Sequence, residues 1–164
     1  MVFRFERPDD FNRLWEMYST LGPETLECLP LLSKRAVEAW FNEFSYEKTL
    51  PVLATVEEEG RERIIGRAML MLQNRDSVRH RAECGVVVHD EYQDKGIGSR
   101  LTGTMLRLAC LKGLKKVTLE VFPENARAVH VYEKHGFVEE GVLGKHYFFR
   151  DRFYDVVVMG RLLE

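Results

Sequence analysis

The sequence predicts a mixed α/β fold of the α+β kind, in which helices pack against a mostly antiparallel sheet. Three observations predict it. Residues 52–57 and 63–72 have the pattern of two strands joined by a charged turn, and residues 137–149 and 153–162 form a second hairpin. Between the hairpins, residues 82–122 have the pattern strand, helix, strand, which implies a parallel pair joined by a right-handed crossover. We therefore expect a mixed sheet of about seven strands flanked by about four helices.

The N-terminal part of the chain predicts one strand and two helices. In residues 2–6, phenylalanines alternate with charged residues, which is typical of a half-buried strand. A helix opens at Pro8 and ends at Gly22. Its apolar face consists of Phe11, Leu14, Trp15, Tyr18 and Leu21. A second helix follows Ser33, with an apolar face of Ala36, Val37, Trp40, Phe41 and Phe44.

The later elements follow the same two periodicities. Gly66 lies inside a predicted strand and indicates a bulge or a close approach of another segment. Residues 82–89 include three consecutive valines, which is typical of a buried strand. The helix after this strand places Leu101, Met105, Leu108 and Ala109 on one face and ends near Lys112 and Gly113. A strand is expected at residues 116–122 and a helix at residues 123–135, with Gly136 as its left-handed cap.

The composition is that of a soluble globular protein with a single domain, residues 1–164. Hydrophobic residues make up 45% and charged residues 30%, and a formal charge of −2 gives no reason to expect nucleic acid. No segment approaches the ~20 apolar residues of a membrane span, and no apolar leader follows Met1. The three cysteines, Cys28, Cys84 and Cys110, are widely spaced, so we expect reduced thiols in the cytoplasm and no metal site.

The chemistry is expected in residues 93–99, between the central strand and the next helix. Gly96 and Gly98 permit a sharp turn and let a ligand approach, while the first amides of the helix point outward unpaired. Such amides bind phosphate, although a plain strand-to-helix turn explains the same pattern. A dinucleotide fingerprint fits worse because it needs glycine or alanine where Leu101 stands, and the Gly-Lys-Ser/Thr of a P-loop is absent.

Gln93, Gly96 and Gly98 resemble the Gln/Arg-x-x-Gly-x-Gly/Ala pyrophosphate loop of the GNAT superfamily of N-acetyltransferases, which use acetyl-CoA. Residues 125–137 resemble a second motif of that family, Asn-x-x-Ala-x-x-x-Tyr-x-x-x-Gly-Phe. The resemblance, strong over residues 53–163, implies a GNAT fold with a splayed parallel pair of strands. It also implies that acetyl-CoA is held by Val86, Val87, Val88, Gln93, Asp94, Lys95, Gly96, Ile97, Gly98, Ser99, Asn125 and Ala128.

Acetyl transfer to an amine needs a neutral amine, a donor for the developing oxyanion and a proton for the departing thiolate. Tyr132 is the predicted general acid, since a phenol can donate to the thiolate, and a packed core tyrosine is its alternative interpretation. By resemblance, Glu83 on the central strand is the predicted general base. Glu120 on the neighbouring strand competes for that role, and either carboxylate could instead be structural. Asn125 also suits a helix N-cap.

The acceptor amine is expected between the first two helices, their connection at residues 23–32 and the last hairpin. The connection carries Leu26, Leu29, Leu31 and Leu32, which either pack on the core or, by resemblance, form a substrate wall. Substrate contacts are predicted for Glu120, Tyr147, Tyr154 and Asp155, although tyrosines in a hairpin also pack across strands.

The resemblance thus implies an acyltransferase that acetylates a small-molecule amine, such as an amino acid, a polyamine or an antibiotic. The first alternative is acetylation of a protein N-terminus or lysine, and the second is a CoA-binding sensor without transfer. Because relatives are often dimers, a homodimer is among the expected partners, whereas nucleic acid and membrane are not.

Overall fold

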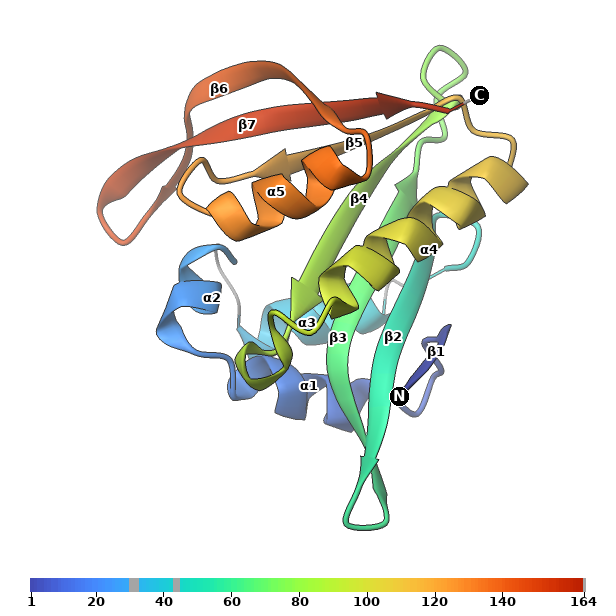
Figure 1. Ribbon diagram of the computed structural model, residues 1–164, viewed down its shortest axis with the longest axis vertical. Coiled ribbons are helices and arrows are strands. Elements are labelled where there is room, and N and C mark those ends of the chain that lie inside the picture. Colours follow the sequence, from blue (N-terminus) through green and yellow to red (C-terminus); the bar gives the residue numbers. More distant parts are fainter. Residues whose placement is uncertain (30–32, 43–44, 164) are drawn as a thin grey trace.

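One seven-stranded sheet organises the protein, with strand order β1-β2-β3-β4-β5-β7-β6 (Figure 1). The computed structural model describes residues 1–29, 33–42 and 45–163. The elements, in chain order, are β1 (Val2–Phe5), α1 (Phe11–Ser19), α2 (Pro23–Glu27), α3 (Lys34–Asn42), β2 (Thr49–Glu58), β3 (Arg61–Leu72), β4 (Arg81–Val88), the 3₁₀ turn η1 (Asp90–Tyr92), α4 (Ile97–Leu111), β5 (Lys116–Val121), α5 (Ala126–Lys134), β6 (Val138–Phe149) and β7 (Arg152–Leu162).

Every strand pairing is antiparallel except that of β4 with β5, which is parallel. The expected mixed, mostly antiparallel sheet is therefore confirmed, and the parallel pair lies where the strand, helix, strand pattern predicts it. Among the described residues, no helix is long and apolar enough to cross a membrane.

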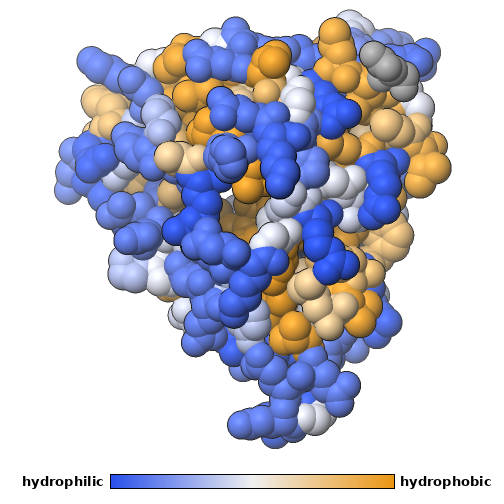
Figure 2. All heavy atoms as spheres, viewed as in Figure 1, coloured by the Kyte–Doolittle hydropathy of each residue, from blue (hydrophilic) through white to orange (hydrophobic). Residues whose placement is uncertain are grey.

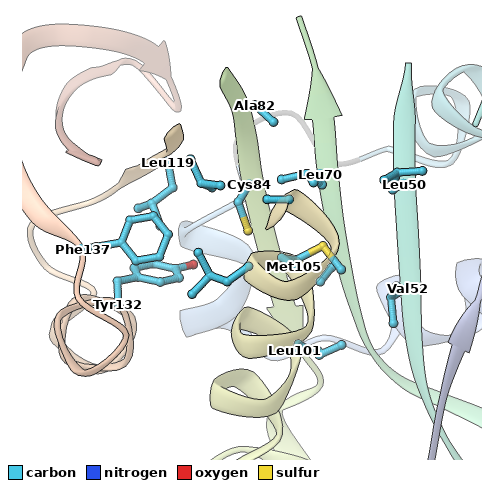
Figure 3. Close-up of a cluster of buried hydrophobic side chains, with 14 of the residues drawn as sticks. Leu50, Val52, Leu70, Ala82, Cys84, Leu101, Met105, Leu119, Tyr132 and Phe137 are labelled. Carbon is cyan, nitrogen blue, oxygen red and sulfur yellow. The ribbon is translucent and has the colours of Figure 1, made fainter. Parts of the chain in front are cut away.

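The helices lie in two layers, one on each face of the sheet (Figure 1). Because side chains alternate between the two faces of a strand, neighbouring residues of β2 pack against different helix layers. Val52 packs toward α4, and Leu53 packs toward α1. The larger core joins the sheet to α4 and includes Leu70, Cys84, Leu101, Met105, Leu119, Tyr132 and Phe137 (Figure 3). The smaller core joins it to α1 and α3 and includes Leu14, Met17, Tyr18, Leu21, Val37 and Ile64.

The helix α2 is an addition to the predicted fold. The sequence predicts an apolar connection there, but Pro23 occupies the first helical position, where its fixed backbone angle favours a helix and its missing N–H is not needed. The turn closes with a hydrogen bond from the Leu26 amide to the Gly22 carbonyl at 3.0 Å. Leu31, Leu32 and Phe44, which the sequence assigns to the connection and the second helix, lie outside the described residues.

The bulge predicted at Gly66 is confirmed. The register of β2 and β3 shifts between Ala54, which faces Gly66, and Thr55, which faces Ile64. A Cβ on Gly66 would lie 3.1 Å from Leu101 Cδ1, so the bulge also brings β3 close to α4.

The start of α5 corrects the expected boundary at residue 123, because the helix begins at Ala126. The reason is the Asn125 side chain, which accepts a hydrogen bond from the Ala128 amide at 3.1 Å and caps the helix. The other end agrees with the prediction, since Gly136 has the left-handed φ of 76°.

Candidate active site

The parallel strands β4 and β5 part after a short paired segment. Pairing runs from Arg81 opposite Lys116 to Glu83 opposite Thr118, whereas β4 continues to Val88 and β5 continues to Val121. The two strands therefore diverge beyond Glu83, as the resemblance implies, and the edge of β4 is left open toward β5.

Hydrogen bonds at the ends of β4 show which backbone groups face this opening. The Lys116 amide donates to the His80 carbonyl at 3.3 Å, and the His89 amide donates to the Ile65 carbonyl of β3 at 2.9 Å. Because the direction of backbone groups alternates along a strand, even-numbered residues of β4 face β5 and odd-numbered residues face β3. The amides and carbonyls of Val86 and Val88 thus face the opening, where an extended amide-containing ligand could pair with them.

A cleft of about 730 Å³ extends over this opening. Its walls come from α2, β4, the glycine loop, the first turn of α4, β5, α5 and the last hairpin. In the view of Figure 2, a hollow with a hydrophobic floor and a hydrophilic rim lies between α2, α5 and the start of α4. The predicted site residues that line the cleft are Val86, Val87, Val88, Gln93, Asp94, Gly96, Ile97, Gly98, Ser99, Glu120, Asn125, Ala128, Tyr132, Tyr147 and Tyr154.

The glycine loop presents free amides to the cleft. Gly96 caps α4 in the left-handed conformation, with φ 75°, and the first helical bond runs from the Arg100 amide to the Gly96 carbonyl at 3.0 Å. The amides of residues 97–99 therefore have no partner within the helix, at its positive end. A Cβ on Gly98 would have only Val88 Cγ2 within 4 Å, at 3.7 Å, so packing does not require glycine there. The space left by Gly98 is suited to a close-approaching anion.

Side chains from three segments meet around Gln93. Its Nε2 donates to Thr25 Oγ1 at 2.9 Å and to the Val88 carbonyl at 3.1 Å. Its Oε1 accepts a hydrogen bond from Arg127 of α5, whose Nε also lies 3.3 Å from Asp94 Oδ1. Thr25 and Arg127 are not among the site residues predicted from the sequence. Arg127 could have been noticed because it lies inside the second motif, but no local signal marks Thr25.

Lys95 differs from the other loop residues. Its ammonium donates to the Glu91 carbonyl at 2.9 Å and lies 5.0 Å from the centre of the Tyr92 ring. It is not among the described residues that line the cleft. Its predicted contact with the cofactor would therefore require the side chain to leave these partners.

Tyr132 lies at the wall of the cleft with only 7% of its surface exposed. Its hydroxyl points toward Cys84 and the core side of β4 (Figure 3). Burial, followed by the nearby Cys84 thiol, raises the pKa of Tyr132 well above its ordinary value of 10.0. The residue is therefore a neutral phenol that holds a proton at physiological pH.

The two predicted base candidates occupy different places. Glu83 is the last residue of β4 that pairs with β5, at the point where the strands part, and it is not among the described residues that line the cleft. Burial, followed by the charge of Glu120, raises the pKa of Glu83. Glu120 lines the cleft, and its Oε2 accepts a hydrogen bond from the Tyr147 hydroxyl at 2.9 Å.

Among the predicted acceptor contacts, the Asp155 side chain bonds within the β6–β7 hairpin to which it belongs. Its Oδ1 accepts a hydrogen bond from the Lys145 amide at 2.7 Å, and it is not among the described cleft-lining residues. Tyr147 and Tyr154 face the cleft and pack in an aromatic cluster with Phe122, at ring distances of 5.8 and 5.7 Å. Within residues 1–29, 33–42 and 45–163, no group of three or more His, Cys, Asp or Glu is arranged to hold a metal ion.

A mixed sheet that opens beside a glycine loop at a helix start defines the GNAT class of fold. A solved structure described as the acetyltransferase of GNAT family from Streptococcus pneumoniae superposes with a TM-score of 0.80, at 28% identity over 99% of both chains. Residues 12–137 match the family described as "Acetyltransferase (GNAT) family". The chain therefore belongs to the GNAT acetyltransferase family.

Two curated relatives are similar over part of the chain. A spermidine N(1)-acetyltransferase from Vibrio cholerae is 35% identical over 102 residues, which are 62% of this chain and 58% of the relative. An L-amino acid N-acetyltransferase from Escherichia coli is 33% identical over 102 residues, 60% of this chain and 62% of the relative. The similarity thus spans about three fifths of the length of these relatives.

Proposed function

We propose that the protein is an N-acetyltransferase that transfers an acetyl group from acetyl-CoA to a primary amine of a small molecule. The observation that carries this proposal is the divergence of β4 and β5 beside the unpaired amides of residues 97–99, in one continuous cleft. Membership of the GNAT family supports the same activity.

The chain's own groups suit acetyl-CoA. The amides of residues 97–99 and the guanidinium of Arg127 offer donors and positive charge for a diphosphate. The backbone groups of Val86 and the amide of Val88 face the opening and suit the amides of a pantetheine arm, while the Val88 carbonyl already accepts a hydrogen bond from Gln93. When bound, acetyl-CoA supplies an activated thioester carbonyl, and these contacts would hold that group between the parted strands.

Tyr132 is the proposed general acid. It is a buried, protonated phenol at the cleft wall, so it can give its proton to a departing thiolate. The open amides of β4 are the proposed donors to the oxyanion, because preorganised N–H groups stabilise developing negative charge. The remaining role, that of the base, belongs to one of the two glutamates, Glu83 or Glu120.

Two features support a small-molecule acceptor. The relatives described above are named for acetylation of spermidine and of L-amino acids. The lining of the cleft also combines carboxylates with aromatic residues, and Glu120 accepts a hydrogen bond from the Tyr147 hydroxyl, a combination that suits an ammonium group. The carboxylates are Glu24, Glu27, Glu120 and Glu124, and the rings include Trp40, Phe122, Tyr147 and Tyr154.

The cytoplasm is the proposed compartment, because Cys28, Cys84 and Cys110 are all free thiols. A homodimer stays a prediction from the resemblance.

The test is release of free CoA thiol from acetyl-CoA across a panel of polyamines, amino acids, aminoglycosides and peptides with free N-termini. We expect turnover that depends on a small-molecule amine. If turnover occurs only with peptides, the acceptor is a protein amine and the proposal of a small-molecule acceptor is wrong. Binding of CoA without amine-dependent release would make the protein a sensor, and thermal stabilisation by NAD or ATP but not by CoA would overturn the whole proposal.

A further inference from the structure

We infer that Arg67 of β3 binds a carboxylate of the acceptor, and that the acceptor is therefore an amine of the amino acid type and not a polyamine. This inference rests on the proposed function and names the class of small molecule that the same cleft acetylates. Arg67 would contact the acceptor away from the reacting nitrogen, so its role is to determine specificity.

Arg67 lies on the acceptor side of the sheet. Ala68 and Leu70 of β3 belong to the core beneath α4, so the alternate residues Arg67 and Met69 face the layer of α1 and α3. The cross-strand partner of Arg67 is Val87 of β4, which packs against the core of that same layer. Arg67, Met69 and Val87 all line the cleft, so they form its floor on the side where the acceptor is expected.

The Arg67 side chain is buried and carries an unpaired donor. The residue is only 3% exposed, and its Nε and Nη2 donate to the two carboxylate oxygens of Glu6 at 2.7 and 3.0 Å. Its Nη1 is buried and makes no hydrogen bond within the described part of the chain, although the Tyr18 hydroxyl lies near the guanidinium. Because nearly all buried donors in folded proteins are paired, we expect the partner of Nη1 to come from the cleft that Arg67 lines.

Two other buried arginine nitrogens, Arg13 Nε and Arg81 Nε, are also unpaired among the described residues. Neither side chain belongs to the described lining of the cleft. Arg67 differs from both because a molecule bound in the cleft can supply the hydrogen-bond acceptor that its Nη1 lacks.

The free edge of this guanidinium is suited to a carboxylate. An arginine side chain stays charged in proteins, and its planar N–H groups match two carboxylate oxygens at once. Glu6 occupies the edge formed by Nε and Nη2, which fixes the plane of the guanidinium before a ligand arrives and lowers the entropy lost on binding. A protonated polyamine offers only donors and positive charge, so Arg67 would repel it.

Arg67 is also the cleft-lining cation that is best placed to meet an acceptor. In the part of the chain that the structure describes, the cations of the cleft are Arg67, Arg127 and Arg152. Arg127 is bound to Gln93 of the glycine loop, where the diphosphate is proposed. Arg152 is an exposed residue of the last hairpin, and its guanidinium carbon lies 4.3 Å from the centre of the Tyr154 ring. Arg67 is therefore the one of these three that is buried on the acceptor side.

The space between Arg67 and the parted strands is open. Because Cys84 and Leu119 belong to the core beneath α4, Gly85 of β4 and Glu120 of β5 face the acceptor side, and both line the cleft. A Cβ on Gly85 would have no described atom within 4 Å. An amino acid can therefore place its carboxylate at Arg67 and its amine toward the opening, where the carboxylate of Glu120 suits the ammonium form.

The first test compares each member of a panel of L-amino acids with its own carboxamide in the wild-type protein, by release of free CoA thiol. The two compounds of each pair share the side chain and the reacting nitrogen and differ in the anion. We expect kcat/KM to be at least about 100-fold higher for the acid, because the amide leaves Nη1 without an anionic partner. The amide has the less basic amine, so easier deprotonation cannot explain a preference for the acid. Polyamines should react more slowly than the preferred amino acid.

The second test removes Arg67 together with its partner. Arg67→Met alone would leave Glu6 as an unpaired buried charge, so the variant combines Arg67→Met with Glu6→Leu and replaces the buried ion pair by apolar side chains. The ratio of kcat/KM for acid and amide should fall to about 1, because the group that distinguishes them is gone. The Kd for acetyl-CoA should stay at the wild-type value. Arg107→Met, at an exposed residue of α4 outside the cleft, is the matched control and should keep the wild-type ratio.

A readout independent of turnover is calorimetric binding of the amino acid and of its amide to the protein saturated with CoA, which has no acetyl group to transfer. The acid should bind more tightly to wild type, and the difference should disappear in the double variant. Arg67→Lys keeps a cation beside Glu6 but loses the planar fork, so it should retain only part of the preference. The wild-type comparison and Arg67→Lys decide the question if the double variant does not fold.

Equal kcat/KM for acids and amides, faster turnover of polyamines, or a preference that survives in the double variant would overturn the inference and leave acetyl transfer intact. Loss of the preference in Arg152→Met would assign the carboxylate to that arginine, which also overturns the inference. A wild-type protein that releases no thiol with any amine would instead overturn the proposed function itself, so the two failures are distinguishable.

Discussion

The hydroxyl of Thr25 donates a hydrogen bond to Asp90 Oδ1 at 2.6 Å, and so joins α2 to the turn that precedes the glycine loop. The other oxygen of Asp90 accepts the Gly22 amide at 2.7 Å. The same Thr25 hydroxyl accepts a hydrogen bond from Gln93 of the loop. A wall of the proposed acceptor site and the proposed diphosphate loop are therefore parts of one hydrogen-bonded chain.

Replacing Thr25 should weaken acceptor binding more than cofactor binding. Thr25→Val keeps the shape of the side chain but removes two hydrogen bonds, each worth about 1 kcal/mol. We expect the KM for the amine to rise roughly tenfold, with a smaller change in the Kd for acetyl-CoA, because the free amides of residues 97–99 are intact. Steady-state kinetics and calorimetry measure both. Thr104→Val, on the exposed side of α4, is the control, and an unchanged KM in Thr25→Val would contradict the coupling.

Tyr132→Phe tests the proposed general acid. Turnover should fall by roughly 100-fold, while acetyl-CoA binds as before, because only the proton donor is lost. The pKa of Tyr132 lies above 10.0, so the acid is lost only when the pH rises through that raised value. The wild-type pH profile should accordingly show no basic limb from this group up to about pH 10. Unchanged turnover in the variant would remove Tyr132 from the mechanism.

Gly98→Ala should separate stability from cofactor affinity. Alanine favours a helix over glycine by about 0.5–1 kcal/mol, and its Cβ meets only an ordinary contact at 3.7 Å, so the free energy of unfolding should rise. The methyl group occupies the space proposed for the diphosphate, so the Kd for acetyl-CoA should increase by about tenfold.

Gly103→Ala is the matched control in the same helix, since it lies outside the cleft and a Cβ there meets His135 Cε1 at 3.4 Å. It should stabilise the helix with no change in affinity for acetyl-CoA. Equal affinities in both variants would show that the ligand does not approach α4 at Gly98.

The buried carboxylate of Asp10 should make stability depend on acidic pH. Burial raises its pKa, but hydrogen bonds from Arg4, the Arg7 amide and Arg13 outweigh burial, so the pKa lies below the ordinary 3.8. A carboxyl whose folded pKa is lowered stabilises the protein fully above the unfolded pKa, and this contribution disappears as the pH falls through the folded value.

Asp10→Asn should therefore lower the free energy of unfolding at pH 7 by about 3 kcal/mol, and the difference should shrink as the pH falls below about 4. Urea denaturation at a series of pH values measures it. Asp9→Asn, an exposed neighbour, should cost much less, and a loss that stays constant down to pH 2 would argue against the ionised carboxylate as the source.

The amino-acid sequence predicted the order of the strands and of the α-helices other than α2, the bulge at Gly66 and the cap at Gly136. It also predicted the family, through the motifs at residues 93–98 and 125–137. These features depend on local periodicity, on the ability of glycine to adopt positive φ angles and on the spacing of motif residues. Short segments of the sequence are enough to encode each of them.

Which side chains reach the cleft depends on how distant segments pack together in the fold. The sequence favours Glu83 over Glu120 as the base, but Glu83 is the last paired residue of β4 and does not line the cleft, whereas Glu120 does. Thr25 and Gln93 are 68 residues apart in the sequence and form a hydrogen bond. Arg127 is 34 residues from Gln93 and donates a hydrogen bond to the same side chain. Such long-range contacts depend on strand register and on the packing of distant segments, which no local sequence pattern encodes.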